Sequence, residues 1–477
     1  MPYKEYQNPL IERYASKEMS FIFSSYNKIL NWRKLWIALA ECEKELGISI
    51  SNEQIEEMNN NIEHIDFDYA KEMERKLRHD VMAHIHTFGK ICPKAMPIIH
   101  LGATSAFVGD NTDIILMREA VSLIRKKTIN VVNNLKKFSL RYKNTPTLGF
   151  THFQPAQLTT VGKRASMWLQ DILLDFEDVE FAYKTLRFRG VKGTTGTQAS
   201  FLRLFDGDHR KVKQLDALLS EKFDFDKVFL ITGQTYSRKQ DSRVLKTLAG
   251  IAESTHKIAS DIRLLQNLKE IEEPFEKTQI GSSAMAYKRN PMRCERICSL
   301  SKYLISLTIN PYLIHATQWL ERTLDDSANR RISIPEAFLA ADAVLELLYN
   351  VTDNLIVYEK IIEKHIKEEL PFMATENIIM ESVKKGSDRQ QIHEIIRKHS
   401  MNATSRVKND GKDNNLIESI ISDHNIPVSK EEIETLVNPK TFIGRAPEQV
   451  ETFISEEVDP ILGQYTSSIG GMGEIKV

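Results

Sequence analysis

The chain has 477 residues, of which 42% are hydrophobic and 27% are charged, and its formal net charge is −1 at pH 7. Such a length suggests about three domains and a core that needs no disulfides, and the balanced charge argues against nucleic acid or an anionic membrane surface as a partner. Only 20 residues are glycine, below the usual share of ~7%, which favours long helices over turn-rich β structure.

The four cysteines lie at positions 42, 92, 294 and 298, without Cys-x-x-Cys spacing and without His and Cys pairs spaced for zinc. We therefore expect reduced thiols that pack in the core, and no metal. The N-terminal residues lack an apolar targeting segment, and no apolar run approaches the ~18 residues of a membrane helix. These features predict a cytoplasmic protein with no membrane partner.

Before residue 105 the sequence has the pattern of short helices, one of which begins near Asn31. In this region Arg78 and His79, beside Asp80, could supply positive charge and hydrogen bonds to substrate oxygens. The following His84 and His86 match neither the i, i+4 pair of a helical zinc site nor a His-Glu-x-x-His motif. We expect a structural role for these two and no metal at the cluster.

A long amphipathic helix is predicted from Asp113 to Leu140, where apolar residues recur at alternating spacings of three and four. The same spacing recurs from Val244 to Leu265, and helical patterns also cover 156–188, 292–321 and 335–369. Several long helices of this kind predict a helical bundle and an all-α fold. Their apolar stripes fit either a core within one chain or contacts with neighbouring subunits, and sequence alone does not decide between these.

The segment from Gly149 to Gln157 places a histidine ahead of a predicted helix. Pro155 suits the first helical turn, so we expect His152 just outside the helix N-terminus, where the helix dipole favours neutral imidazole. Neutral imidazole can act as an acid or a base at physiological pH. A lone loop histidine is more often structural, but beside Thr151 and together with the loop at 270–291, His152 is our candidate general acid.

The run from Arg187 to Gln198 combines glycines with hydroxyls and cations, as a phosphate-binding loop does. It lacks the Gly-Lys-Ser/Thr ending of a P-loop, and no strand is predicted before it, so that motif is excluded. Two interpretations remain, a tight turn that lines a substrate site and a purely structural turn.

Residues 270–291 show no convincing periodicity over about twenty positions, which in a compact domain indicates a binding loop or lid. Within it, Lys288 and Asn290 could bind a carboxylate while Ser282 presents its oxygen to a carbon-bound proton. Ser283 is the less favoured alternative base. Because serine is a weak base in water, we expect this loop to be mobile without ligand and to close over the substrate.

Two further polar runs, 231–239 and 321–331, hold candidate binding residues. The second brings Arg322, Ser327 and Arg331 close together in sequence, and arginine is the side chain best shaped to grip a phosphate or a carboxylate with two hydrogen bonds. For an isolated run, the alternative is a solvated helix face with internal Asp and Arg pairs.

Beyond about residue 358 the chain becomes more charged, and Pro371 and Gly386 mark breaks between short helical pieces. We expect three helical domains. They are an N-terminal domain at 1–104, a central long-helix bundle carrying the loop at 105–357, and a C-terminal domain at 358–477. We assign no chemistry to the last of these.

The pattern Gly-Ser-x-x-Met-x-x-Lys-x-Asn-Pro at 281–291 resembles the signature loop of the fumarase/aspartase superfamily, whose members expel fumarate from a substituted succinate. Most members carry proline where Ala286 stands, a change that could loosen the loop but removes no reacting group. The runs at 78–80, 187–198, 231–239 and 321–331 further resemble the branch of the superfamily that splits adenylosuccinate. The resemblance covers nearly the whole chain and weakens toward the C-terminus.

This resemblance implies an all-α homotetramer with a tetrameric helical core, in which each active site is assembled from three subunits. It implies neither a metal nor an organic cofactor. The implied reaction splits adenylosuccinate into AMP and fumarate by general acid/base β-elimination in purine nucleotide biosynthesis. The second implied substrate is the succinylated aminoimidazole carboxamide ribotide, SAICAR, which yields AICAR and fumarate.

Carried over residue by residue, the resemblance matches Ser282 to the general base and His152 to the general acid. The residues matched to the succinyl carboxylates are Lys288, Asn290, Thr104, Ser105, Thr151 and Gln234. Those matched to the nucleotide end and its phosphate are Arg13, Tyr14, Arg296, Arg322, Ser327 and Arg331. His79 and Asp80 match a further substrate-binding pair, to which the neighbouring Arg78 is added.

Three other functions stay open on the sequence alone. Argininosuccinate lyase shares the signature loop but would need a pocket for a guanidinium group instead of a phosphate. A non-catalytic protein that kept the fold, as some lens crystallins did, is disfavoured by the presence of both Ser282 and His152. A helical nucleic-acid-binding protein is disfavoured by the charge balance.

Overall fold

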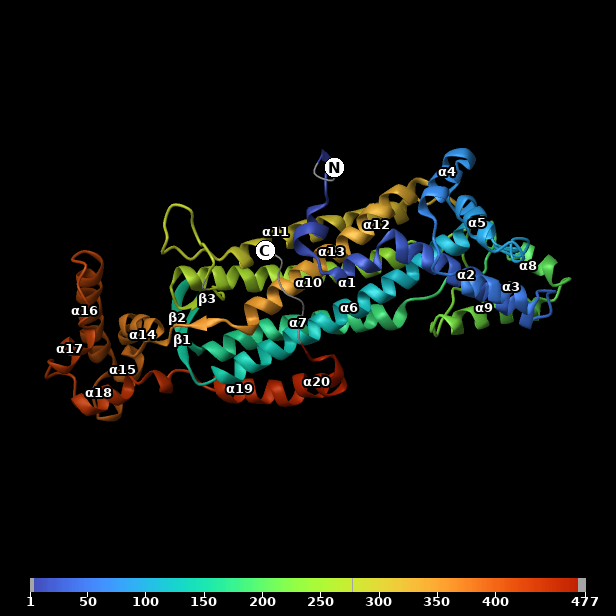
Figure 1. Ribbon diagram of the computed structural model, residues 1–477. Helices are drawn as coiled ribbons and strands as arrows, with labels where there is room; N and C mark the ends of the chain where they lie inside the picture. The colour runs from blue at the N-terminus through green and yellow to red at the C-terminus, as the bar shows by residue number, and fades with distance from the viewer. Residues whose placement is uncertain (1–3, 277, 471–477) are drawn as a thin grey trace.

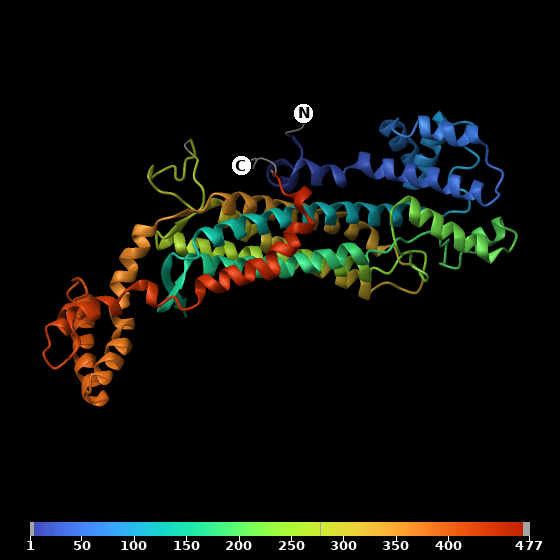
Figure 2. The same ribbon diagram turned by 90° about the horizontal axis from the view of Figure 1, so that it is seen from below.

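The computed structural model describes residues 4–276 and 278–470. Figure 1 shows an elongated molecule in which long helices form a central bundle, with short N-terminal helices at one end and a group of C-terminal helices at the other. The view turned by 90° shows the same division (Figure 2). Within the described ranges, β structure is confined to two small two-stranded sheets, so the all-α prediction is confirmed.

Five long helices build the bundle. They are α6 (Ser105–Arg141), α7 (Val161–Thr185), α10 (Lys239–Asn267), α11 (Met292–Leu307) and α13 (Asp325–Asp353). In α6, Val121, Ile124, Val131 and Leu135 are all buried in the main hydrophobic core, as the helical spacing of apolar residues predicts. With 37 residues and a rise of about 1.5 Å per residue, α6 is about 55 Å long.

α1 (Lys17–Ile22) lies along the bundle, against α6 and α13. Other helices cover one end of the bundle. They are α2 (Ser25–Glu45), α3 (Asn52–Asn60), α4 (Phe67–Leu77), α5 (Asp80–Ile91), α8 (Ala199–Leu204) and α9 (His209–Lys222). Hydroxyl side chains fix where two of them begin. Ser24 accepts a hydrogen bond from the Asn27 amide at the start of α2, and Ser51 and Gln54 form a capping box at the start of α3.

Two small sheets lie at the other end of the bundle. β1 (Pro146–Thr151) and β2 (Gln154–Thr160) form an antiparallel hairpin that follows α6. β3 (Ile271–Glu272) pairs antiparallel with β4 (Ile356–Val357), which ties the chain after α10 to the chain after α13. Neither sheet is predicted by the sequence.

Several helix boundaries differ from the prediction. α6 begins at Ser105, well before Asp113, and the helix expected over 156–188 begins only after β2. The segment 292–321 divides into α11 and α12 (Ile309–Ala316). The segment 335–369 belongs to α13 and α14 (Glu359–Met373), which β4 separates.

Pro371, which the sequence analysis took as a break between helical pieces, lies inside α14, and Pro335 likewise lies inside α13. An internal proline removes one backbone hydrogen bond at a cost of about 3 kcal/mol. Around Pro335 that cost is offset because Ile334, Ala337 and Phe338 are buried in the bundle core. Tertiary packing therefore outweighs the tendency of proline to end a helix.

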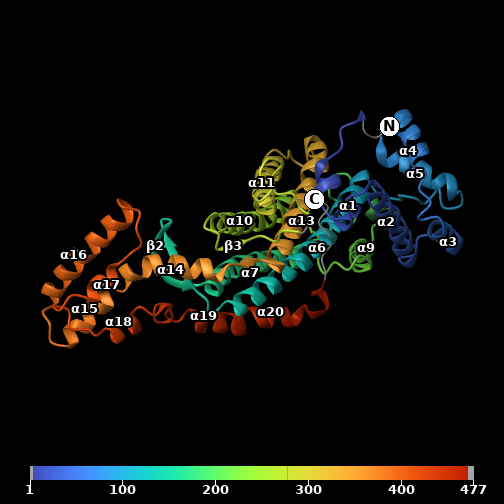
Figure 3. The same cartoon turned by 60° about the vertical axis from the view of Figure 1, so that its left-hand side comes forward.

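The C-terminal helices form a second hydrophobic core of their own. They are α15 (Thr375–Lys384), α16 (Arg389–Lys408), α17 (Leu416–Ile421) and α18 (Lys430–Leu436), and Ile378, Ile392, Ile396, Ile420 and Ile433 are among the buried residues. The chain then returns to the bundle, where α19 (Ala446–Phe453) packs on α7 and is followed by α20 (Asp459–Gln464) (Figure 3). We propose the division near residues 104 and 358 as the domain organisation, with α19 and α20 lying against the central domain.

Candidate active site

The candidate residues lie mainly at two opposite ends of the bundle. Ser105 begins α6 and His152 lies in the hairpin after its end, so about 55 Å of helix separates them. α10 and α13 have 29 residues each, and each spans about 43 Å between the same two ends. Gln234 and Arg322 precede these two helices, whereas the loop 270–291 follows the end of α10 (Figure 1). One chain therefore carries two partial sites that do not meet.

The first partial site is a cleft of about 380 Å³ at the end of the bundle where α6 begins. Eight candidate residues line it, namely Arg78, His79, Asp80, Ser105, Gln234, Arg322, Ser327 and Arg331. Its cationic lining residues are Lys28, Arg78, Arg238, Arg322, Arg330 and Arg331, and we call it the cation cleft. The structure thus brings four separate sequence segments into one pocket.

The N-terminus of α6 opens on the cation cleft through Ser105 and the residues that follow it. Thr104 occupies the N-cap position, but its side chain accepts no capping hydrogen bond, and its hydroxyl oxygen is buried with no partner in the described part of the chain. The free amide groups of a helix N-terminus carry a partial positive charge and bind anions. This end of α6 is therefore suited to hold a carboxylate.

The segment 78–80 forms a turn between α4 and α5 at the rim of the cleft. Arg78 closes α4 with a left-handed φ of 55°, and the Nδ1 atom of His79 accepts a hydrogen bond of 3.3 Å from the Met82 amide. Asp80 begins α5 and accepts a hydrogen bond of 2.9 Å from Arg331 of α13. Two candidate residues that are distant in sequence are thus paired across the cleft.

A buried ion network holds the walls of the cleft together. Arg238 donates to Asp326 at 2.8 Å and to Asp110 at 3.0 Å, and all three side chains are buried. Burial alone would raise the pKa of Asp110, but the guanidinium groups of Arg238, Arg330 and Arg189 outweigh burial and hold that pKa below its usual value. The network joins α6 to the starts of α10 and α13, and so fixes the shape of the cleft.

Sequence reasoning missed most of this network. Arg330 donates to the Asp241 carboxylate at 2.7 Å and to the Tyr236 hydroxyl at 2.6 Å. For the run 321–331, the alternative of a solvated helix face is wrong at Asp326 and Arg330, which are buried. The internal Asp–Arg pair that this alternative includes does form, because Arg322 lies 3.4 Å from Asp326. The charged runs indicated a binding region, but which of their side chains are buried depends on how the helices pack.

The second partial site includes His152, which lies at the tip of the β1–β2 hairpin. Thr151 pairs with Gln154, and His152 and Phe153 form the turn with φ of 53° and 56°. Left-handed φ at both positions is typical of a tight two-residue hairpin turn. The prediction that His152 precedes a helix is wrong, since Pro155 lies in β2, and the helix-dipole argument does not apply. The tip, with Thr151 and His152, is exposed.

The signature loop, residues 281–291, lies at the same end as the hairpin and is yellow-green in Figure 1. The Ser282 Oγ atom accepts hydrogen bonds from the backbone amides of Ala284 at 3.3 Å and Met285 at 3.1 Å. The side-chain amide of Asn290 donates to the Gly281 carbonyl at 2.7 Å. The loop therefore folds back on itself, and the Lys288 side chain is exposed.

Glycine is required at position 281 because a Cβ atom there would lie 2.1 Å from the Lys288 carbonyl oxygen. The base of the loop is held by other contacts. The Tyr358 hydroxyl donates to Glu272 at 2.9 Å, and Arg289 lies 3.4 Å from the same carboxylate. Glu273 accepts hydrogen bonds of 3.0 and 2.9 Å from two amides in the first turn of α11. The ends of the loop are anchored, and its candidate side chains Ser282 and Lys288 lie outside these anchors.

A third group lies along α11 and α13, where Arg13 and Tyr14 belong to a single π-helical turn, Leu10–Tyr14. The Arg296 guanidinium of α11 lies 5.6 Å from the centre of the Tyr14 ring, a cation–π contact. Ser16 fixes this segment by donating its amide and hydroxyl to the buried Asp342 at 2.7 and 3.1 Å. The three candidates of this group do not line the cation cleft.

Two other sequence features have structural roles. Arg189 and Lys192 are buried, and Arg189 donates to the Gln234 carbonyl at 2.6 Å while Lys192 pairs with Asp216. The first half of the run 187–198 therefore has a structural role and supports the cleft residue Gln234, whereas Thr194, Thr195 and Thr197 are exposed. His84 packs edge-on against Trp32 at 5.5 Å, and burial lowers its pKa to about 4.

Within the described ranges, no group of three or more His, Cys, Asp and Glu side chains is arranged to hold a metal ion. In the same part of the chain, no helix combines the length and the apolar character needed to cross a lipid bilayer. All four cysteines are buried free thiols.

Comparisons with known proteins agree with this architecture. A family model described as "Lyase" matches residues 37–304, and one described as "Adenylosuccinate lyase C-terminus" matches residues 371–453. The adenylosuccinate lyase of Saccharomyces cerevisiae is 56% identical over 97% of this chain and 97% of its own. The adenylosuccinate lyase of Schizosaccharomyces pombe is 53% identical over 98% of each chain. The crystal structure of 3-carboxy-cis,cis-muconate lactonizing enzyme from Pseudomonas putida, 19% identical, has the same fold with a TM-score of 0.81 over 94% of this chain and 99% of that one.

Proposed function

The chain belongs to the adenylosuccinate lyase family, and we propose that Ser282 and His152 are the general base and general acid with which it releases fumarate from adenylosuccinate. The protein is a lyase, and its reaction is a fumarate-releasing elimination. The proposal concerns the groups that perform each step. Its main support is the signature loop, where the Ser282 oxygen accepts two backbone hydrogen bonds in the segment that carries Lys288 and Asn290.

The difficult step is removal of a weakly acidic proton from the carbon next to a carboxylate. As Ser282 takes this proton, negative charge develops on that carboxylate, and Lys288 and Asn290 would stabilise it where it appears. The amides of Ala284 and Met285 that point at Ser282 Oγ favour its charged form. Because the Asn290 amide has two N–H donors, one can remain on the Gly281 carbonyl while the other binds substrate.

His152 would protonate the purine nitrogen that leaves, on the face of the substrate opposite Ser282. General acids of this kind typically contribute a factor of about 10²–10⁴ in rate. Its place at an exposed hairpin tip, next to Thr151, supports this role because the imidazole can reach into a site on another chain.

The cation cleft would hold the substrate. Arg322, Ser327 and Arg331 would contact the nucleotide end, and the N-terminus of α6 with Thr104 and Ser105 would receive a succinyl carboxylate. The remaining proposed substrate contacts are Arg13, Tyr14, Arg78, His79, Asp80, Thr151, Gln234 and Arg296.

We propose a homotetramer whose active sites combine the cleft of one chain with the loop and hairpin of others. The separation of about 43 to 55 Å along single helices supports this, because a residue at each end cannot touch the same small molecule. An exposed apolar stripe supplies a surface for assembly. On α7, Met167, Leu174 and Phe181 are 45%, 56% and 57% exposed and recur every seven residues, the spacing of a helix–helix seam.

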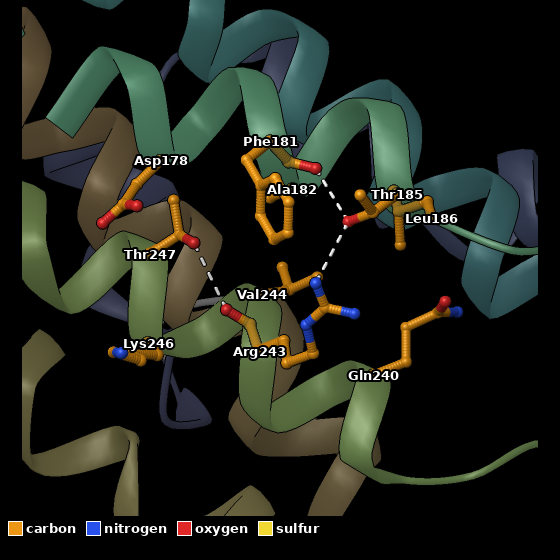
Figure 4. A pocket seen from close by; sticks show the side chains of 10 residues that line it. All are labelled: Asp178, Phe181, Ala182, Thr185, Leu186, Gln240, Arg243, Val244, Lys246 and Thr247. Atoms are coloured by element: carbon orange, nitrogen blue, oxygen red, sulfur yellow. Dashed lines mark hydrogen bonds between the residues drawn. The ribbon is translucent and has the colours of Figure 1, made fainter. Parts of the chain in front are cut away.

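Figure 4 shows one end of this stripe, where Phe181 projects into the groove between α7 and α10. The Arg243 guanidinium lies 5.1 Å from the centre of the Phe181 ring, and Thr185 and Gln240 line the same groove. A half-exposed aromatic ring beside polar groups is typical of a surface that a partner covers.

The same groups suit SAICAR as a second substrate, because it too carries a succinyl group on a leaving nitrogen. A cytoplasmic location, independence of metals and organic cofactors, and the absence of a nucleic-acid partner stay predictions of the sequence.

Ultraviolet monitoring of the purified protein with adenylosuccinate, with and without a chelator, tests the proposed function. We expect turnover that the chelator does not change, and no turnover of argininosuccinate. Ser282→Ala should lower kcat by at least about 10²-fold, as loss of a catalytic proton-transfer group does. The matched control is Ser283→Ala, which removes the neighbouring hydroxyl and should cost much less. A Ser282→Ala variant as active as its parent would remove Ser282 from the mechanism.

A further inference from the structure

Lys28 lies in the first turn of α2 and lines the cation cleft, although no sequence signal marked it. Its side chain is half-buried, and its ammonium nitrogen lies 5.1 Å from the centre of the Trp32 ring one turn further along the helix. The aromatic ring holds the ammonium by a cation–π contact but does not neutralise its charge.

The other cleft cations are mostly neutralised by carboxylates. Arg238, Arg322, Arg330 and Arg331 each form at least one salt bridge to an aspartate. Within the described residues, Lys28 and Arg78 form none. Of these two, Arg78 is exposed at the rim and Lys28 is half-buried in the wall. Lys28 is therefore the unneutralised cation that is most withdrawn from water.

Burial is the dominant influence on the charge of Lys28. It lowers the pKa of Lys28 below its ordinary value, and the charge of Arg331 adds to this, while the carboxylates of Asp113, Asp80 and Glu74 oppose the change without cancelling it. An anion bound next to the ammonium would reverse the unfavourable effect. A desolvated cation in a substrate cleft is a recognised sign of ligand binding.

We propose that Lys28 is a further substrate-binding residue that holds the phosphate of the bound nucleotide together with Arg331. The inference rests on the proposed function of the cation cleft. A phosphate carries about two negative charges near neutral pH, and Arg331 already shares its guanidinium with Asp80. Lys28 supplies the positive charge that Arg331 alone lacks, and an ammonium serves phosphate well as a point charge. The succinyl carboxylate of the substrate would then bind at the N-terminus of α6.

The test compares Lys28→Met, Lys28→Arg and the control Lys34→Met, which removes an exposed lysine from the same helix. For Lys28→Met we expect KM for adenylosuccinate and Kd for AMP, measured by calorimetry, to rise about 10- to 100-fold, the effect of one hydrogen bond to a charged group. kcat should stay within a few-fold. Lys28→Arg should retain most AMP affinity, and Lys34→Met should match the parent.

Inhibition by fumarate, a dicarboxylate without phosphate, shows whether Lys28 binds the phosphate or a carboxylate of the substrate. We expect its inhibition constant to be unchanged in Lys28→Met. Unchanged AMP affinity would overturn the proposal, and an equal loss of fumarate and AMP binding would overturn the assignment to phosphate. Should Lys28→Met fail to fold in thermal melts, Lys28→Gln carries the same comparison. Turnover by the parent protein tests the proposed function separately.

Discussion

Mixing two inactive variants tests whether the active site is shared between chains. One variant, Arg322→Ala/Arg331→Ala, damages the cation cleft, and the other, Ser282→Ala, damages the signature loop. α13 begins next to Arg322 and ends before β4, whose partner β3 lies at the base of the loop, so about 43 Å of helix separates the two lesions in one chain. A site that needs both regions must take them from different chains.

The magnitude of recovery follows from this separation. When the two variants are combined in equal amounts and assemble at random, the cleft is intact with a probability of about one half, and so is the loop from a neighbouring chain. About one quarter of the sites then have both regions intact. The mixture should therefore regain about 25% of the parent activity, whereas each variant alone stays far below this level.

The assay is unfolding and joint refolding of the two variants, followed by ultraviolet measurement of adenylosuccinate cleavage. The parent protein refolded under the same conditions sets the scale, and a size-exclusion measurement with one tagged variant shows that mixed oligomers form. If mixed oligomers are present and the activity does not exceed the mean of the two variants, the shared site is wrong.

Three more predictions concern single substitutions. Asp326→Ala leaves Arg238 buried with one partner fewer, so we expect thermal or denaturant unfolding to show a loss of about 3–5 kcal/mol, and an unchanged midpoint would contradict the role of the buried network. Tyr358→Phe frees Glu272 at the base of the signature loop, so hydrogen exchange of the loop should rise, and bound substrate analogue should lower exchange there in the parent. Glu43 is buried, and burial raises the pKa of its carboxyl from 4.5 to about 9. Between these pH values the folded chain keeps a proton that the unfolded chain has released. The free energy of unfolding is therefore highest below pH 4.5 and falls as the pH rises to about 9, by up to about 1.4 kcal/mol per pH unit. Glu43→Gln should flatten this part of the stability curve, and a parallel curve would show that Glu43 does not titrate there.

The long helices could be predicted because each carries its own apolar period, which the bundle core then buries. The β1–β2 hairpin could not. Its turn is His152-Phe153 rather than an Asn-Gly type of pair, and Pro155 is equally suited to the first turn of a helix. The hairpin packs against α14, which follows it by two hundred residues. A strand pair held by so distant a helix leaves little local trace in the sequence.

The candidate cleft residues could be singled out because they stand in dense polar runs that resemble a known family. Their meeting in one pocket could not be derived from those runs, since it depends on how α5, α6 and α13 pack. Lys28 shows the limit most clearly. It stands in α2, a largely buried helix that carries no binding motif, and only the fold reveals that Lys28 lines a cleft formed by segments from other parts of the chain.

The two partial sites are stabilised in different ways, and this difference bears on how the proposed active site forms. The cation cleft is stabilised inside one chain by Arg238, which donates hydrogen bonds to both Asp110 and Asp326. Its shape therefore does not depend on contacts with a neighbouring chain. His152 and Ser282 instead stand on segments that their own chain anchors mainly at the base. If Ser282 is the base and the site is shared as proposed, Ser282 would stay in contact with water, where a serine is a poor base, until the loop closes on substrate in the cleft of another chain. We therefore expect an unassembled chain to be inactive, and activity to depend on both assembly and substrate binding.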